Sequence, residues 1–160
     1  MRRRTRESTD YLVVHWAFSL PDPSYGADTV DRWHRENGFL RIGYHYVIPW
    51  NGLIEEGELE HRWGAHARPY NDRSIGICLI GGRDEDGEMV LNFSDSQLAS
   101  LVWLLDRLKE EYPEAQVVGH RDLTPDSAPY CPGFDAGHLF RSGEVRPVEG
   151  VSDNLTHAGG

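Results

Sequence analysis

The stretch Tyr11-Leu-Val-Val-His-Trp16 decides the fold, because it is a short run of apolar and β-branched residues. Such a run is typical of a buried strand. A second run of this kind, Ser74-Ile-Gly-Ile-Cys-Leu-Ile80, ends at Gly81-Gly82. Two shorter strands are predicted at residues 43–48 and at Val117-Val118, and Asn51-Gly52 is typical of a hairpin turn that leads into Leu53-Ile54.

Two helices are predicted between these strands. A helix over about residues 95–112 begins at a capping box of Ser94 and Gln97 and ends before Pro113. Its apolar residues recur at helical spacing: Leu98, Leu101, Val102, Leu105, Leu108 and Tyr112. An earlier helix, capped by Asp28 and ended by Asn37-Gly38, carries Val30, Trp33 and His34 on one face, where we expect Trp33 and His34 to pack.

Strands interleaved with helices predict an α/β fold, a single domain with a central mixed β-sheet flanked by helices. The domain is expected over residues 10–141. A flexible basic N-terminal arm is expected at residues 1–9 and a flexible C-terminal tail at residues 142–160. The arginines of the arm are read as a solvated tail, or else as an arm that reaches an acidic partner.

Composition excludes several classes of protein. The 160 residues include 16 basic and 26 acidic side chains, a net charge of −10, which opposes binding to nucleic acid. No apolar run approaches the ~20 residues of a membrane span, and no apolar stretch follows the basic start as in a signal peptide. Two cysteines cannot form a disulfide framework. We expect a soluble cytoplasmic monomer without membrane insertion or direct contact with nucleic acid.

Chemistry is suggested by two histidines at strand ends. His15 follows Leu12-Val13-Val14, His120 follows Val117-Val118, and Cys131 lies in a proline-rich loop. Strand ends of an α/β sheet are where sites collect, and two imidazoles with a thiolate suit Zn²⁺ with one position left for water. From spacing alone the pattern is weak, because a histidine at a strand end commonly forms a hydrogen bond to the backbone. Cys131 could also form a disulfide with Cys78. Without that bond, Cys78 is expected to be a core residue.

Seven segments occur in order along the chain: Val14-His15, Arg32-Trp33-His34, Gly43-Tyr44-His45-Tyr46, Gly64-Ala65-His66-Ala67, Tyr70-Asn71 with residues 74–82, Gly119-His120-Arg121-Asp122, and Cys131-Pro132. In this order they resemble the zinc-dependent N-acetylmuramoyl-L-alanine amidases of type 2. That family is related to the peptidoglycan recognition proteins and includes phage lysozymes of the amidase type, to which the likeness is strongest. The resemblance covers residues 8–135, about four-fifths of the chain.

The resemblance implies that His15, His120 and Cys131 bind one zinc ion per chain. It also implies that Tyr44 assists catalysis by holding the attacking water or the polarised carbonyl. The implied reaction is hydrolysis of the amide that joins N-acetylmuramic acid to L-alanine in bacterial peptidoglycan. Zinc suits this reaction, because it lowers the pKa of bound water to about 7.

Neighbouring residues allow a second interpretation each. Tyr44 could simply pack in its strand, and His45, which alternates with it, is expected to face the other side in a structural role. His66 either lines the substrate groove or caps a loop.

The chain departs from the family in the loop between His120 and Cys131, which is a few residues longer than in the phage lysozymes and differs at one notable position. Phage relatives have a lysine two residues before the cysteine ligand, where this chain has Pro129. The single lysine, Lys109, lies on the solvent side of a helix and cannot substitute. Three residues are candidates for the missing donor to substrate or oxyanion: Arg121, Thr124 and Ser127.

Two functions of different classes remain open from the sequence. One is a phage endolysin, which accumulates in the host cytoplasm and reaches the cell wall after the membrane is permeabilised. The other is a binding protein on the same fold, which recognises peptidoglycan without cleaving it or, as in some phage relatives, inhibits a phage RNA polymerase. Cys131 favours the enzyme, because members of the family that only bind usually lack the cysteine ligand.

Overall fold

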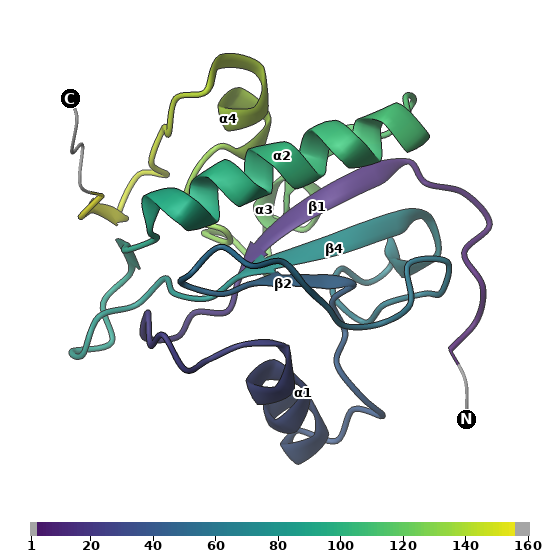
Figure 1. Cartoon of the computed structure of the whole chain (residues 1–160), viewed down its shortest axis with the longest axis horizontal. Helices are drawn as coiled ribbons and strands as arrows, with labels where there is room; N and C mark the ends of the chain where they lie inside the picture. The colour runs from purple at the N-terminus through teal and green to yellow at the C-terminus, as the bar shows by residue number, and fades with distance from the viewer. Residues whose placement is uncertain (1–2, 156–160) are drawn as a thin grey trace.

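Five strands form the central sheet of the computed structural model, which describes residues 3–155 (Figure 1). The strands are β1 (Tyr11–Trp16), β2 (Tyr46–Ile48), β3 (Glu55–Glu56), β4 (Ser74–Leu79) and β6 (Gln116–Gly119). They lie in the order β3-β2-β4-β1-β6; β3 is antiparallel to β2, and the other pairings are parallel. The predicted mixed sheet is therefore confirmed.

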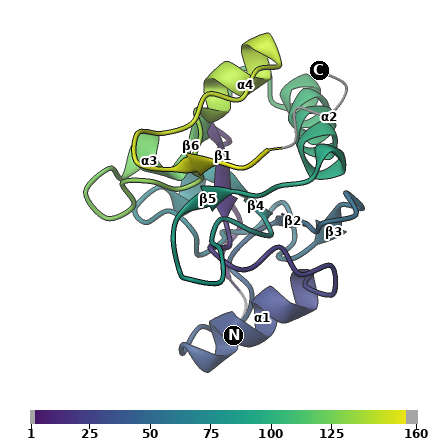
Figure 2. The same ribbon diagram turned by 90° about the vertical axis from the view of Figure 1, so that its left-hand side faces the viewer.

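Helices cover both faces of this sheet. They are α1 (Ala27–Glu36), α2 (Asp95–Glu111), α3 (His120–Leu123) and α4 (Ala136–Ser142). Helices α2 and α4 lie on one side and α1 on the other (Figure 2). A 3-10 turn at Asn71–Arg73 precedes β4, and β5 (Val90–Leu91) pairs with β7 (Ser152–Asp153) in a small separate sheet. None of the helices in residues 3–155 is both long and apolar enough to cross a membrane.

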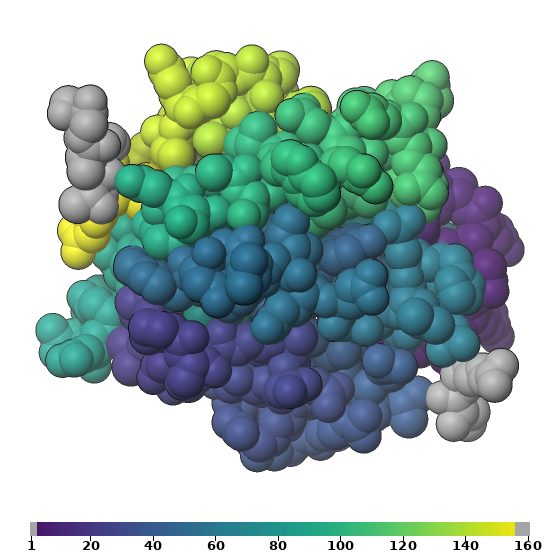
Figure 3. Space-filling model, in the orientation of Figure 1, coloured from purple at the N-terminus to yellow at the C-terminus, as the bar shows by residue number. Residues whose placement is uncertain are grey.

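The two faces of the sheet carry different side chains. On the α2 face, apolar residues of β1 and β4 pack against the buried side of α2 in the larger core cluster: Leu12, Val14, Trp16, Ile75, Ile77, Leu79, Leu101, Leu104, Leu105 and Leu108. The other face holds a smaller cluster of Val30, Ile42, Val47, Cys78 and Ile80. Because side chains alternate along a strand, His15 projects from β1 on this second face. In the space-filling view the segment around residue 50 lies directly below α2 (Figure 3), and there Ser94 and Ser100 donate to the carbonyls of Trp50 and Gly52.

Several elements begin or end where the sequence predicts, and others differ. Helix α2 has the expected capping box, in which Ser94 Oγ accepts from the Gln97 N–H at 3.0 Å and Gln97 Oε1 accepts from the Ser94 N–H at 2.9 Å. Helix α1 is capped by Gly26 rather than Asp28, because Thr29 Oγ1 accepts the Gly26 N–H. Strand β2 starts at Tyr46, three residues later than expected. The short elements β5, α3, α4 and β7 were not predicted.

The segments expected to be loose make contacts with the domain. Arg3 donates to the carbonyls of Ile42 and Arg41 and pairs with the buried Glu58. Past residue 142, Val151 is buried and β7 pairs with β5. The expected boundaries at residues 10 and 141 therefore do not coincide with a break in packing, because these contacts depend on long-range partners that composition does not reveal. Residues 1–2 and 156–160 of the expected arm and tail lie outside the described residues, and the flexibility of both segments stays a prediction.

Candidate metal centre

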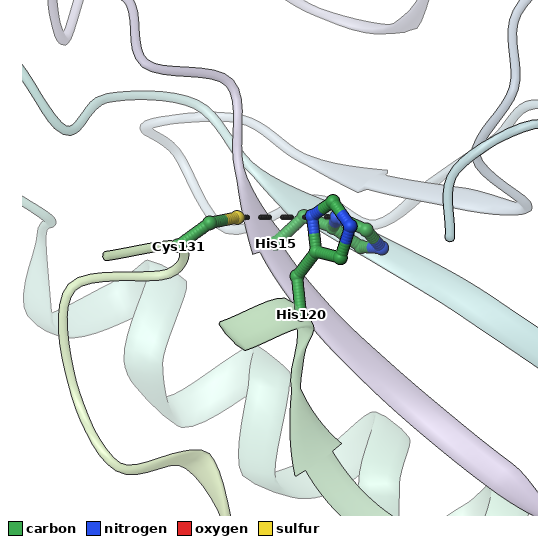
Figure 4. Close-up of side chains that lie close together, drawn as sticks. All are labelled: His15, His120 and Cys131. Atoms are coloured by element: carbon green, nitrogen blue, oxygen red, sulfur yellow. Dashed lines mark hydrogen bonds between the residues drawn. The ribbon is translucent and has the colours of Figure 1, made fainter. Parts of the chain in front are cut away.

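The structure brings together the two histidines and the cysteine that the sequence singled out. His15 lies near the end of β1, His120 begins α3 directly after β6, and Cys131 lies in the loop before α4 (Figure 4). One ligand atom from each residue lies within 4.8 Å of the others. The His15 and His120 ring centroids are 4.5 Å apart, and Cys131 Sγ lies 3.9 Å from His15 Nδ1.

Strand pairing and local hydrogen bonds hold these three residues in place. Val14 pairs with Gly119 in the parallel β1–β6 register. His15 and His120, which directly follow these two residues, therefore lie side by side at the same edge of the sheet. The Asp122 carboxylate accepts the Gly119 N–H at 2.8 Å and so fixes the start of α3. The Cys131 loop is tied to both sides, because the Trp16 N–H donates to Cys131 Sγ at 3.4 Å and the Arg121 N–H donates to the Cys131 carbonyl at 2.9 Å.

Burial sets the protonation of the cluster. It lowers the pKa of His15 well below the usual value, and the neighbouring histidine rings act in the same direction. Burial also lowers the pKa of His120 and raises the pKa of the Cys131 thiol to about 12, although the Trp16 N–H opposes the latter shift. Neutral imidazoles offer lone pairs to a metal, and the thiol releases its proton when it binds one. Two imidazoles and one cysteine therefore fit a metal ion such as zinc, with a fourth position left for water.

Tyr44 lies beside this cluster on a loop that two backbone contacts position. Its ring centroid is 4.9 Å from that of His15 and 5.3 Å from that of His34. The Gly43 N–H donates to His34 Nδ1 at 2.9 Å, and the Ala65 N–H donates to the Gly43 carbonyl at 2.9 Å. Burial, reinforced by the Cys78 thiol, raises the pKa of Tyr44 well above its usual value. The phenol is therefore a hydrogen-bond donor at neutral pH.

An open pocket of about 500 Å³ adjoins the cluster. Its lining residues come from three parts of the chain, at residue 39, at residues 65–71 and at residues 120–127: Phe39, Ala65, His66, Ala67, Arg68, Asn71, His120 and Ser127. Of the predicted substrate-contacting residues, His66 and Ser127 line this pocket. Thr124 and Arg121 are not among the lining residues. The Thr124 hydroxyl donates to the His120 carbonyl at 3.4 Å and Arg121 Nε to the Pro129 carbonyl at 2.9 Å, and the Ser127 hydroxyl donates to the Thr124 carbonyl at 3.4 Å.

Sequence reasoning missed the contributions of Arg68 and Asn71 to this pocket. Asn71 Oδ1 accepts the N–H groups of His66 at 3.0 Å and Ala67 at 2.9 Å, and so shapes the loop that carries Arg68. The signal was available, since Tyr70-Asn71 was among the family segments and Arg68 directly follows another.

The remaining residues that the sequence singled out make contacts outside the cluster of His15, His120 and Cys131. His45 is buried, with Nε2 2.7 Å from the Arg62 carbonyl and Nδ1 accepting the Gly76 N–H at 3.0 Å. Lys109 Nζ donates to the carbonyls of Pro113 and Ala115 near the end of α2. Both cysteines lie in the described part of the chain and are free thiols, so the alternative of a Cys78–Cys131 disulfide is wrong. The buried Cys78 thiol instead faces Tyr44.

By fold and site, the molecule is an α/β protein in which three residues that could hold a metal ion meet at one edge of the parallel strands. Residues 5–134 match the family described as N-acetylmuramoyl-L-alanine amidase. The chain belongs to this family, and it is a hydrolase of that kind.

Relatives and solved structures agree with this assignment. The chain is 37% identical to the endolysin of Escherichia phage T7 over 142 residues, which are 89% of this chain and 92% of that protein. It is 35% identical to the endolysin of Enterobacteria phage T3 over the same shares of each chain. The endolysin LysCS from Clostridium intestinale superposes with a TM-score of 0.69 at 26% identity, covering 84% of this chain and 82% of that one. Drosophila PGRP-LB superposes with a TM-score of 0.66 at 25% identity, covering 88% and 82%.

Proposed function

We propose that the protein is a zinc-dependent endolysin, which cleaves the amide between N-acetylmuramic acid and L-alanine in the peptidoglycan of a bacterial host. The observation that carries this proposal is the cluster of His15, His120 and Cys131, whose ligand atoms lie within 4.8 Å of one another. The endolysins of phages T7 and T3 match nearly the full length of the chain and support the biological role. On this proposal the enzyme stays in the host cytoplasm until the membrane is permeabilised, and then acts on the wall.

The roles of the residues follow from their positions. His15, His120 and Cys131 would hold the zinc ion, which when bound supplies a water of pKa about 7 and an electrophile for the amide carbonyl. Tyr44, a protonated donor beside His15, would donate a hydrogen bond to the oxygen on which negative charge develops. A non-catalytic binding protein would need none of this arrangement, so the complete cluster favours the enzyme.

The adjoining pocket is the proposed site for the muramoyl peptide. His66 and Ser127 line it, and Arg68 adds a cation on a chain whose net charge is −10. A stem peptide carries carboxylates, and an arginine binds a carboxylate through charge-assisted hydrogen bonds. We therefore propose that Arg68 binds the peptide and Ser127 lies near the scissile amide.

A zymogram with purified cell walls tests the function. We expect clearing by the wild type, loss of clearing with a chelator, and recovery when zinc is returned. Cys131→Ser should lose most of the zinc and the clearing, whereas Cys78→Ala, which removes the other thiol, should keep about one zinc per chain by elemental analysis. Full clearing by the zinc-free Cys131→Ser protein would contradict the proposal.

A further inference from the structure

A chain of hydrogen bonds leads from His15 into the interior of the protein. His15 Nε2 lies 2.8 Å from His66 Nδ1, and His66 Nε2 lies 3.2 Å from Ser74 Oγ. Ser74 Oγ in turn lies 2.7 Å from the Tyr70 carbonyl oxygen. The exposed fractions of His15, His66 and Ser74 are 1%, 9% and 0%, so water does not compete for these contacts.

The chemistry of the last partner sets the direction of every bond in this chain. The Tyr70 carbonyl can only accept a hydrogen bond, so Ser74 donates its single hydroxyl proton to it. Ser74 Oγ must then accept the proton of His66 Nε2. A neutral imidazole carries one ring proton, so His66 Nδ1 is an acceptor and His15 donates to it from Nε2. His15 Nδ1 is left as an acceptor, and it faces the Cys131 thiol, whose Sγ lies 3.9 Å away (Figure 4).

The His66 ring occupies space that two glycines leave open, one in strand β4 and one in the loop before it. A Cβ at Gly76 would lie 2.6 Å from His66 Cγ, and one at Gly64 would lie 2.8 Å from His66 Cδ2. Glycine weakens a strand interior and marks the close approach of another group, which here is the imidazole. Asn71 also holds the backbone of His66 and Ala67. The ring is therefore held by the protein itself, independently of any ligand.

We propose that His66 and Ser74 are positioning residues that fix His15 as its Nε2–H tautomer, so that Nδ1 is ready to bind metal before metal arrives. Partners of this kind orient a metal-bound imidazole and raise its basicity. That the metal is zinc rests on the function proposed above. The tautomer itself is a property of the metal-free chain, so it can be tested whether or not that function holds.

The first test needs no substitution. We expect ¹⁵N–¹H correlation spectra of the metal-free, histidine-labelled protein at neutral pH to show His15 and His66 both protonated at Nε2. A proton on His15 Nδ1 would overturn the proposal. Failure of the wild type to bind zinc would instead contradict the proposed function and leave the tautomer result standing.

The second test uses two variants of one residue. His66→Asn keeps an oxygen acceptor close to the position of Nδ1, whereas His66→Leu has similar bulk and cannot accept. Chelator competition should show zinc bound roughly 10- to 100-fold more weakly by His66→Leu, with most of the affinity restored in His66→Asn. Ser74→Ala should leave His66 in a mixture of tautomers and weaken zinc binding in the same direction. Equal zinc affinity of wild type and a folded His66→Leu protein would overturn the proposal; if that variant does not fold, the wild-type spectrum and Ser74→Ala decide.

Discussion

At the scale of single residues, the hydroxyl of Tyr44 separates catalysis from packing. Tyr44→Phe keeps the ring beside His15 and His34 but removes the donor. We expect the variant to fold, to bind zinc as the wild type does, and to lose roughly 10²-fold or more in kcat, because the lost interaction forms in the transition state. Turnover of a muramoyl-peptide substrate, measured beside zinc content, checks this. Unchanged turnover would reduce Tyr44 to a packing residue.

The position of the missing lysine gives a second residue-scale prediction. Pro129 has no side-chain donor, and its carbonyl is taken by Arg121. Of the three candidate donors, Ser127 lines the pocket. We expect Ser127→Ala to cost roughly 10² in single-turnover rate and Arg121→Ala and Thr124→Ala to cost less. Pro129→Lys should then gain nothing at constant zinc content. A faster Pro129→Lys variant, together with an unchanged rate for Ser127→Ala, would mean that no side chain replaces the family's lysine as donor in this chain.

Arg68 is expected to act on substrate binding rather than on the chemical step. Arg68→Ala should raise KM by about 10-fold with little change in kcat, because a charge-assisted hydrogen bond to a carboxylate contributes equally before and during the reaction. Arg107→Ala is the matched control, since it removes the same charge from α2, where Arg107 lies over the Trp103 ring. An equal rise in KM for both variants would show a general effect of charge instead of a contact.

At the scale of elements, α2 depends on its first turn. Ser94 caps the helix and also donates to the Trp50 carbonyl at 2.6 Å, so it joins α2 to the loop after β2. Ser94→Ala should lower the free energy of unfolding by about 1–2 kcal/mol, measured by urea denaturation. Ser96→Ala, two residues further along the chain and exposed to solvent, should change the free energy of unfolding by less than about 0.5 kcal/mol.

The sequence predicted the elements whose signal is local. Periodicity and the capping box located α2, and apolar runs located β1 and β4, because burial of these residues is needed whatever surrounds them. Helix α3 was missed since it is four residues long, and its first residue, His120, was noticed only as a strand end. The strand ends also placed His15 and His120, because the ends of parallel strands share one edge.

What the sequence could not predict are contacts between loops. The hydrogen bond between Ala65 and Gly43, the one between Gly43 and His34, and the one between His15 and His66 join residues 9 to 51 positions apart. No local pattern encodes such pairs, although Gly64 and Gly76, which the His66 ring approaches closely, are traces of the last one. The absence of Thr124 and Arg121 from the pocket has the same origin, since it depends on how the loop between His120 and Cys131 folds.

At the scale of the whole molecule, the two faces of the sheet differ in the side chains that they bury. The α2 face is an apolar core, whereas the α1 face buries His15, His45 and His66 around the site. Burying neutral histidines has a thermodynamic consequence for the whole chain. Their pKa values are lowered in the folded state, to about 4 for His45 and well below the usual value for His15 and His66, chiefly by burial.

The metal-free protein should therefore lose stability on acidification well above the range in which carboxylates titrate. Below pH 6.5 the histidines of the unfolded chain take up protons that the folded chain cannot accept, so the free energy of unfolding falls as the pH falls. For His45 alone, whose pKa is about 4 in the folded chain, the loss between pH 7 and pH 5 is about 2 kcal/mol, because each pH unit below 6.5 costs about 1.36 kcal/mol. Urea denaturation at pH 7 and pH 5 measures it. His45→Gln should be less stable at pH 7, because its bonds to Arg62 and Gly76 are disturbed, yet it should lose about 2 kcal/mol less on acidification. Equal losses in the variant and the wild type would show that His45 does not contribute to the pH dependence.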